Sequence, residues 1–361
     1  MRNRDLLRKR LSPFVSIVLG FLIGFILLLV LGYDAAAGFR FLFQGGVLGM
    51  SEGNLRQFGN VLLNMTPLIL TGLSIAFAFK TGLFNIGVAG QMVFGGFLAT
   101  AAGVLWELPR AIHLPVLILA AMVGGALWAA VPGILKAKFR INEVVTGIMM
   151  NYIALWGVRW FSNRFIPGSD ITQSAPILET STLRSEWLTE LFTRANVNYG
   201  LFIAIAACVL IWFILEKTTF GYELKAVGYN QNAADYAGMK VTRNILLSMV
   251  IAGALAGLAG ATHYAGFSDR LVGLGTLPNQ GFDGIAVALL GLNSPLGVFL
   301  AAFFLGYMNV GGAYMQVMAR IPAELVSIIV STIIYFAALS VLIEGWLKKF
   351  SSKKNRDGGV K

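Results

Sequence analysis

Residues 244–262 have the sequence NILLSMVIAGALAGLAGAT, an apolar run without a single charged side chain. An α-helix needs about 20 mostly apolar residues to cross the hydrocarbon core of a bilayer. The run also carries Gly253, Gly257 and Gly260, and small residues at such spacings let membrane helices approach one another closely. It therefore predicts a membrane-spanning helix that packs tightly against its neighbours.

The composition of the whole chain has the same character. Of its 361 residues, 57% are hydrophobic and 12% are charged, and the mean hydropathy is +0.74. Soluble domains carry about 25% charged residues, so this chain has too few polar groups to cover a surface that faces water. The single cysteine, Cys208, lies in an apolar run and excludes an internal disulfide and a cysteine-rich metal site. We expect an all-α polytopic membrane protein.

Similar apolar runs recur along the chain and predict about ten transmembrane helices. The eighth run is too short to cross a bilayer, so we expect a half-span or a broken helix there. The ten runs lie near residues 12–32, 60–79, 85–105, 113–135, 143–165, 199–216, 244–262, 279–292, 295–313 and 322–346.

The basic residues fall in alternate loops and at the two ends of the chain, which predicts its orientation. With the N-terminus in the cytoplasm, all twelve lysines lie on the cytoplasmic side, as the positive-inside rule requires. We therefore expect a multi-pass protein of the cell membrane with both termini in the cytoplasm. The predicted parts are a cytoplasmic N-terminus (1–11), a transmembrane domain (12–346) with a cytoplasmic loop (217–243) and external loops (33–58 and 166–198), and a basic cytoplasmic tail (347–361).

Several function classes find no support in the residues. No G-x-x-x-x-G-K-[ST] loop is present, so we expect ATP to bind elsewhere than on this chain. His113 and His263 lie far apart and are expected to be packed or interfacial side chains rather than metal ligands. The net charge of +11 is spread over short loops, which argues against nucleic-acid binding. We expect no enzymatic activity, no metal site and no cofactor in this chain.

The cytoplasmic loop 217–243 contains the pattern of a short helix. Asn230 is a favourable N-cap, Ala233 and Ala234 favour helix, and Gly238 is a favourable C-terminal stop. The small apolar surface, including Ala234 and Tyr236, would be exposed unless something covers it, which predicts a docking surface. The alternative is an ordinary loop that lies on lipid headgroups.

This loop resembles the ATPase-contacting loop of ABC importer permeases. It has the pattern G-x-x-x-x-A-x-G-x-N-x-x-A-A-x-x-x-G, whose fixed positions are Gly221, Ala226, Gly228, Asn230, Ala233, Ala234 and Gly238. Residues 84–91 (FNIGVAGQ) and 281–291 (GFDGIAVALLG) resemble two membrane motifs of the permeases that serve branched-chain amino acids, ribose-type sugars and nucleosides. Residues 142–152 (NEVVTGIMMNY) are similar to the sugar and nucleoside branch in particular.

The resemblance implies a permease subunit of an ATP-driven importer, most similar to the nucleoside branch, with a simple sugar or a branched-chain amino acid as alternative cargo. It implies three kinds of partner: a cytoplasmic ATPase that binds ATP and Mg²⁺, a second permease subunit, and an extracytoplasmic binding protein, often a lipoprotein. The implied fold has about ten helices, an inverted repeat and a cytoplasmic coupling helix.

Polar residues inside the apolar runs are candidates for the substrate pathway. The segments at Phe84–Gly87 and Phe282–Ile285 begin from opposite sides of the predicted membrane, as the halves of an inverted repeat would. We expect the pathway to be lined by Asn85, Gln91, Asn151, Phe282 and Asp283. The alternative is that the amides only join one helix to another. A stand-alone secondary transporter is the alternative of a different class, and it would need intramembrane charge pairs.

Overall fold

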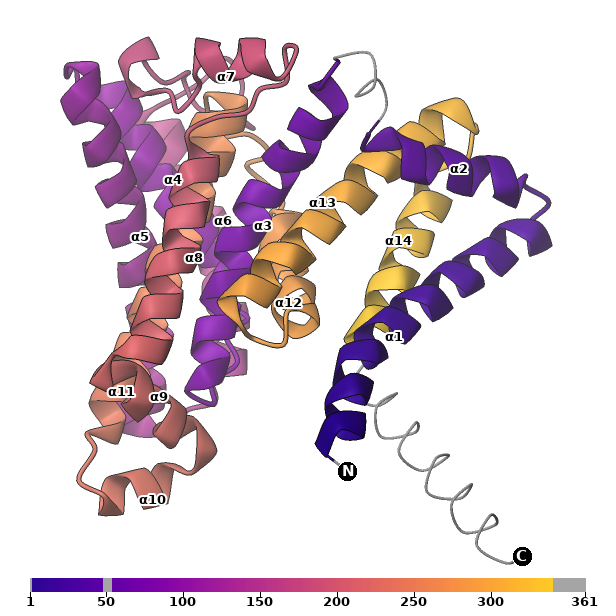
Figure 1. Cartoon of the computed structure of the whole chain (residues 1–361). Helices are drawn as coiled ribbons and strands as arrows, with labels where there is room; N and C mark the ends of the chain where they lie inside the picture. The colour runs from indigo at the N-terminus through magenta and orange to yellow at the C-terminus, as the bar shows by residue number, and fades with distance from the viewer. Residues whose placement is uncertain (1, 48–53, 340–361) are drawn as a thin grey trace, which may run out of the picture. The chain divides into compact units, whose positions relative to one another are not determined.

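The computed structural model describes residues 2–47 and 54–339 (Figure 1). Within these residues the chain forms helices and no β-strand, which confirms the all-α class. The α-helices are α1 (Arg2–Val30), α2 (Ala35–Gly45), α3 (Arg56–Lys80), α4 (Val88–Leu105), α5 (Arg110–Phe139), α6 (Glu143–Phe165), α7 (Glu186–Leu191), α8 (Gly200–Lys217), α9 (Thr219–Tyr229), α10 (Gln231–Tyr236), α11 (Val241–His263), α12 (Asn279–Leu290), α13 (Pro295–Met318) and α14 (Ala323–Ala338). A short 3-10 helix, η2 (Glu179–Ser181), and a π-helical turn, η3 (Tyr264–Ser268), complete the elements.

The structure divides into two compact units. The first combines the residues up to Leu48 with those from Tyr307 onward, and the second comprises Gly49–Gly306. Helices α3 to α12 belong to the second unit, together with the first half of α13.

Six of the described helices are long and apolar enough to cross a membrane: α3, α4, α5, α8, α11 with η3, and α13. Each of the ten predicted runs overlaps a helix. Four of these helices are not both long and apolar enough to cross a membrane. Helix α6 interrupts its apolar run with Asn151 and Arg159, and α12 has only 12 residues, as its short run predicts. Two shorter apolar helices cover Ile17–Val30 and Ala323–Phe336. The chain therefore has the helices of a multi-pass membrane protein, and the count of about ten spans stays a prediction.

In the second unit, α4, α5 and α11 pack with their backbones in contact. A Cβ atom added to Gly125 of α5 would lie 2.1 Å from the carbonyl oxygen of Gly253 on α11. One added to Gly257 would lie 2.0 Å from the carbonyl oxygen of Ala121, and one added to Gly95 of α4 would lie 2.4 Å from the Cα atom of Gly257. The glycines of residues 244–262 therefore allow the tight helix packing that the sequence predicts, because only glycine leaves room for this approach.

The helices of this unit differ in how much of their apolar surface is covered. In the most apolar stretch of α3, 83% of the residues are buried, against 28% in α5 and 33% in α8. The exposed side chains of α5 and α8 are large and apolar, for example Leu119, Leu127, Val209 and Leu210. Such surfaces suit contact with lipid tails, which places α3 at the interior of the bundle and α5 and α8 at its periphery.

In the first unit, α1 packs along α14 and α2 covers part of α1. A Cβ atom on Gly20 would lie 2.7 Å from the Cα atom of Ile333. Asp34 caps α2 by accepting a hydrogen bond of 2.9 Å from the backbone N–H of Ala37. The ring of Phe39 is buried and lies 5.5 Å from the ring of Phe25, edge to face. The segment predicted as an external loop thus contains a helix that is anchored by aromatic packing.

We expect Gly257→Ala to destabilise the protein by at least about 1–3 kcal/mol, because its methyl group has no room beside the Ala121 carbonyl. Thermal unfolding of the purified protein in detergent measures the effect. Gly157→Ala in α6 is the matched control, since a Cβ atom there meets nothing within 4 Å. Equal melting temperatures for the two variants would contradict the close packing of α5 and α11.

Candidate functional site

A cluster of buried amides occupies the beginning of α4. Asn85, in the loop after α3, donates a hydrogen bond of 2.9 Å to Oε1 of Gln91. Gln91 donates one of 3.0 Å back to Oδ1 of Asn85, so the two amides form a reciprocal pair. Both side chains are 1% exposed. An unpaired amide at membrane depth costs several kcal/mol, and this pairing removes that cost for both residues.

Asn151 joins α6 to the same segment. Its Oδ1 accepts a hydrogen bond of 2.8 Å from the backbone N–H of Gly90, and its Nδ2 donates one of 3.0 Å to the carbonyl of Ile86. The side chain is 2% exposed. Gly90 must lack a side chain here, because a Cβ atom would lie 2.8 Å from both Cα and Oδ1 of Asn151. One asparagine therefore ties α6 to the segment that leads into α4.

Three of the five predicted pathway residues thus bond to one another or to backbone in this conformation. For Asn151 this is the helix-joining arrangement that the sequence offered as the alternative, whereas Asn85 and Gln91 pair within one segment. The amides have no exposed surface through which a solute could reach them here. Their role in lining the pathway stays a prediction.

The other two pathway candidates, Phe282 and Asp283, lie in the short helix α12. Its Gly281 abuts α4, since a Cβ atom there would lie 2.5 Å from the Cα atom of Ala89. The structure therefore brings together the two motif segments 84–91 and 281–291, which are distant in sequence. Phe282 is 40% exposed and Asp283 is half-buried, so these two side chains reach a surface of this unit while the amides do not.

The helix predicted in the loop 217–243 is confirmed. Asn230 caps α10 by accepting a hydrogen bond of 3.0 Å from the backbone N–H of Ala233, and Gly238 ends the turn with a φ of +82°. One expectation is wrong: Ala234 is 4% exposed rather than free on the surface. It belongs to a buried cluster with Leu83 and Met249, because α10 packs against α9 and α11.

A second helix in this loop, α9, was not foreseen from the sequence. The fixed positions Gly221, Ala226 and Gly228 all lie in it. A Cβ atom on Gly228 would lie 2.3 Å from the carbonyl oxygen of Lys80 at the end of α3. Asn244 of α11 donates a hydrogen bond of 2.9 Å to Oε2 of Glu223. These contacts anchor the loop to two helices of the bundle.

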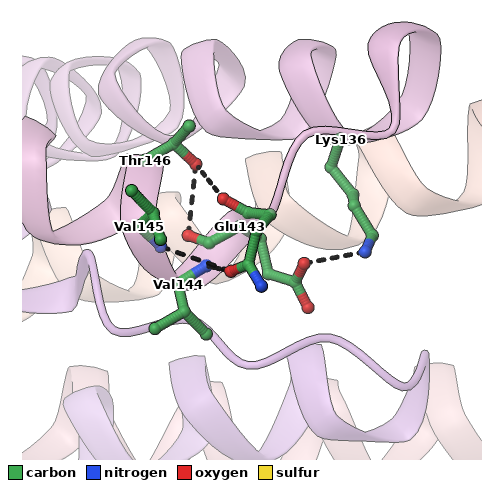
Figure 2. Close-up of polar contacts among 6 residues, drawn as sticks. Lys136, Glu143, Val144, Val145 and Thr146 are labelled. Carbon is green, nitrogen blue, oxygen red and sulfur yellow. Dashed lines mark hydrogen bonds and ion pairs between the residues drawn. The ribbon is translucent and has the colours of Figure 1, made fainter.

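The turn between α5 and α6 lies beside α10 and was also missed as part of this region. Figure 2 shows Lys136 paired with Glu143 at 2.8 Å, next to the start of α6. Asn142 caps that helix through the backbone N–H groups of Val144 and Val145. A cavity of about 390 Å³ separates this turn from α10, lined by Lys136, Ala137, Arg140, Gln231, Asn232, Asp235, Val241, Thr242 and Ile245. The signal in the sequence was that both loops fall on the lysine-rich side.

Two tyrosines dominate the outer surface of this region. Tyr229, at the end of α9, is 92% exposed, and Tyr236, at the end of α10, is 95% exposed. Large exposed aromatic side chains that are close in sequence are typical of protein–protein contact surfaces. The arrangement suits a surface that a partner covers.

We expect Asn151→Ala to destabilise the protein by about 1–3 kcal/mol, because it leaves the buried N–H of Gly90 and the carbonyl of Ile86 without their partner. Thermal unfolding in detergent again measures the effect. Asn163→Ala, on the same helix, is the control, since Asn163 is exposed and makes one long hydrogen bond of 3.4 Å. A loss no larger than that of the control would contradict a structural role for Asn151.

Comparison with known proteins identifies relatives of this chain along nearly its whole length. A family model described as "Branched-chain amino acid transport system / permease component" matches residues 57–338. The guanosine ABC transporter permease protein NupP of Bacillus subtilis is 43% identical over 96% of this chain and 99% of its own length.

Two further relatives differ in their named cargo or in their extent. The glucose ABC transporter permease protein TsgB13 of Haloferax volcanii is 34% identical over 91% of this chain and 87% of its own length. The guanosine ABC transporter permease protein NupQ of Bacillus subtilis is 31% identical over 72% of this chain and 84% of its own length. The chain is thus a membrane transport component rather than an enzyme, and it belongs to the family of branched-chain amino acid transport system permease components.

Proposed function

We propose that this chain is a permease subunit of an ATP-driven importer and forms part of the translocation pathway for nucleosides. The observation that carries the proposal is the near full-length similarity to the guanosine permease NupP, at 43% identity. The apolar helices and the cytoplasmic loop with its exposed tyrosines support it.

The importer has three further components. A second permease subunit completes the pathway, and the similarity of this chain to both NupP and NupQ, two guanosine permease proteins of one bacterium, supports a homologous rather than an identical partner. A cytoplasmic ATPase binds ATP and Mg²⁺, because this sequence lacks a phosphate-binding loop. An extracytoplasmic binding protein delivers the nucleoside.

The cytoplasmic loop 217–243 is the surface that receives the ATPase. Helix α10 and the turn between α5 and α6 offer the contact, and α9 connects it to the bundle. The contact of Gly228 with Lys80 and the hydrogen bond of Asn244 to Glu223 connect α9 to α3 and α11, so a displacement of α10 reaches these helices through α9. Both termini lie in the cytoplasm in this arrangement, as the lysine distribution favours.

The pathway runs past the junction of α4 and α12. About ten spans with an inverted repeat place the two motif segments at the middle of the membrane, and the contact of Gly281 with Ala89 supports that arrangement. Phe282 and Asp283 face the solute there. Asn85, Gln91 and Asn151 join them when ATPase closure opens the amide cluster.

A simple sugar is the second candidate cargo. The relative TsgB13 is named for glucose and is 34% identical over nearly the whole chain. The higher identity to NupP favours the nucleoside.

Uptake by reconstituted vesicles tests the proposal. We reconstitute this chain, its ATPase, the second permease and the binding protein in proteoliposomes. These vesicles are expected to accumulate labelled guanosine only when ATP is present on the side of the membrane that carries the ATPase. ATP-driven uptake of glucose without uptake of guanosine would show that the chain serves an ATP-driven importer of a sugar and not of a nucleoside. Uptake by this chain alone, without ATP, would overturn the importer and favour a secondary transporter.

We expect Tyr236→Ala to abolish most ATP-driven uptake while the protein melts at an unchanged temperature. The side chain is 95% exposed, so its loss leaves the fold intact and removes only a contact with a partner. Co-purification of the ATPase with the variant measures that contact directly. Tyr152→Ala is the control, an exposed tyrosine in α6 away from the loop. Normal uptake and normal ATPase binding by Tyr236→Ala would contradict docking at α10.

A further inference from the structure

A small cavity of about 60 Å³ lies in the second unit, apart from the amide cluster. It is enclosed by the first half of α3, by the end of α11 with η3, by the start of α8 and by the start of α12. Its lining includes Asn64, Asn198, Thr262, His263, Phe267 and Gln280. In the proposed orientation these segments belong to the external half of the bundle, because α3 runs inward from Arg56 and α11 runs outward to His263.

The lining is uncharged and mixes polar with apolar side chains. Amides, hydroxyls and an imidazole lie beside Leu63, Pro67 and Phe267, and none of the lining residues is Asp, Glu, Lys or Arg. A zwitterionic amino acid held at this depth would need charged partners for both of its ends. The residues around the cavity therefore suit a neutral solute with several hydrogen-bonding groups.

Two rings form an aromatic wall of the cavity. The rings of His263 and Phe267 stack at a centroid distance of 6.0 Å with an angle of 21° between their planes. Phe267 is 47% exposed, so one edge of this stack is open. A flat heterocyclic base extends such a stack, whereas a sugar ring presents no π-face to it.

A polar stripe on α3 leads from its external end to the cavity. Asn60 donates a hydrogen bond of 3.2 Å to Oε1 of Gln57, and Asn64 donates one of 2.9 Å to the carbonyl of Asn60. Asn64 is exposed on the isolated chain. Polar side chains at such a position in a membrane helix face a water-filled space rather than lipid tails. The stripe therefore gives the cavity a hydrated approach from outside.

We propose that this cavity is an outer binding subsite for the base of a neutral nucleoside, where Asn64 and Gln280 bond the base edge and Phe267 stacks on its face. The inference rests on the proposed function and deepens it, because it names residues that select the cargo within this chain. Ligand sites usually measure about 300–1,000 Å³, so a cavity of about 60 Å³ receives only the edge of the base, while the rest of the base and the ribose stay in the approach.

Cysteine labelling tests the position of the subsite. The chain has one cysteine, so Cys208→Ala gives a cysteine-free background. In the complete importer, Gln280→Cys is expected to react with a water-soluble maleimide from outside and to be protected by guanosine. Ser169→Cys, in the external loop, should react without protection, and Val209→Cys, on the exposed apolar face of α8, should not react.

Transport kinetics test the role of the subsite. Asn64→Ala and Gln280→Ala are each expected to raise the KM for guanosine about five-fold, the change that follows the loss of one ordinary hydrogen bond. The ATPase rate should stay unchanged. Asn279→Ala, whose side chain neighbours Gln280 in sequence and does not line the cavity, should transport like the wild type. Phe267→Leu should reduce the uptake of guanosine more than it reduces the uptake of a sugar.

The outcomes separate the two proposals. If the wild-type importer takes up no nucleoside, the proposed function fails. If it takes up guanosine while the cavity variants keep the wild-type KM and Gln280→Cys is labelled equally with and without guanosine, the importer stands and the subsite is overturned. Guanosine protection together with raised KM values supports the subsite.

Discussion

The close approach of three backbones, those of α4, α5 and α11, is the constraint on which the second unit depends. The contacts involve Gly95, Gly125 and Gly257, where a single added carbon atom would overlap a neighbouring backbone atom. In lipid there is little hydrophobic drive between helices, so this contact replaces the packing of large side chains. The start of α4 is held in place by it, and the other parts of the candidate site attach to that segment. Helix α6 attaches through Asn151, and α12 attaches where Gly281 meets Ala89.

The loop 217–243 connects to the same segment over a short distance along the chain. Gly228 contacts the backbone of Lys80 and Gly82, and Asn85, the first member of the amide cluster, follows three residues after Gly82. Coupling between distant sites needs a contiguous set of packed elements that can adopt two arrangements. The elements from α10 through α9 to the loop after α3 form a contiguous packed set within one unit.

The sequence predicted those features that depend on neighbouring residues. The apolar runs located the helices, and Asn230 with Gly238 located α10, because span length and capping are local properties. Features that depend on how the folded chain packs were not predictable. Nothing in the local sequence shows that Asn85 pairs with Gln91, that Ala234 lies on the buried face of α10, or that the turn at Lys136 lies beside that helix. The sequence also did not show that Asn151 bonds to the segment before α4, since that partner becomes visible only when α4 and α6 are placed together.

The amide cluster of Asn85, Gln91 and Asn151 has a consequence for the energy source of any movement at this place. A voltage acts on charges, and moving one elementary charge through 100 mV changes the free energy by about 2.3 kcal/mol. The bonds of this cluster join neutral amides and backbone groups, so neither a membrane potential nor a change of pH alters their strength directly. The hydrogen bonds of this cluster would therefore keep their strength in a cell that has lost its membrane potential. A force that separated it would have to arrive mechanically, through the helices that touch it.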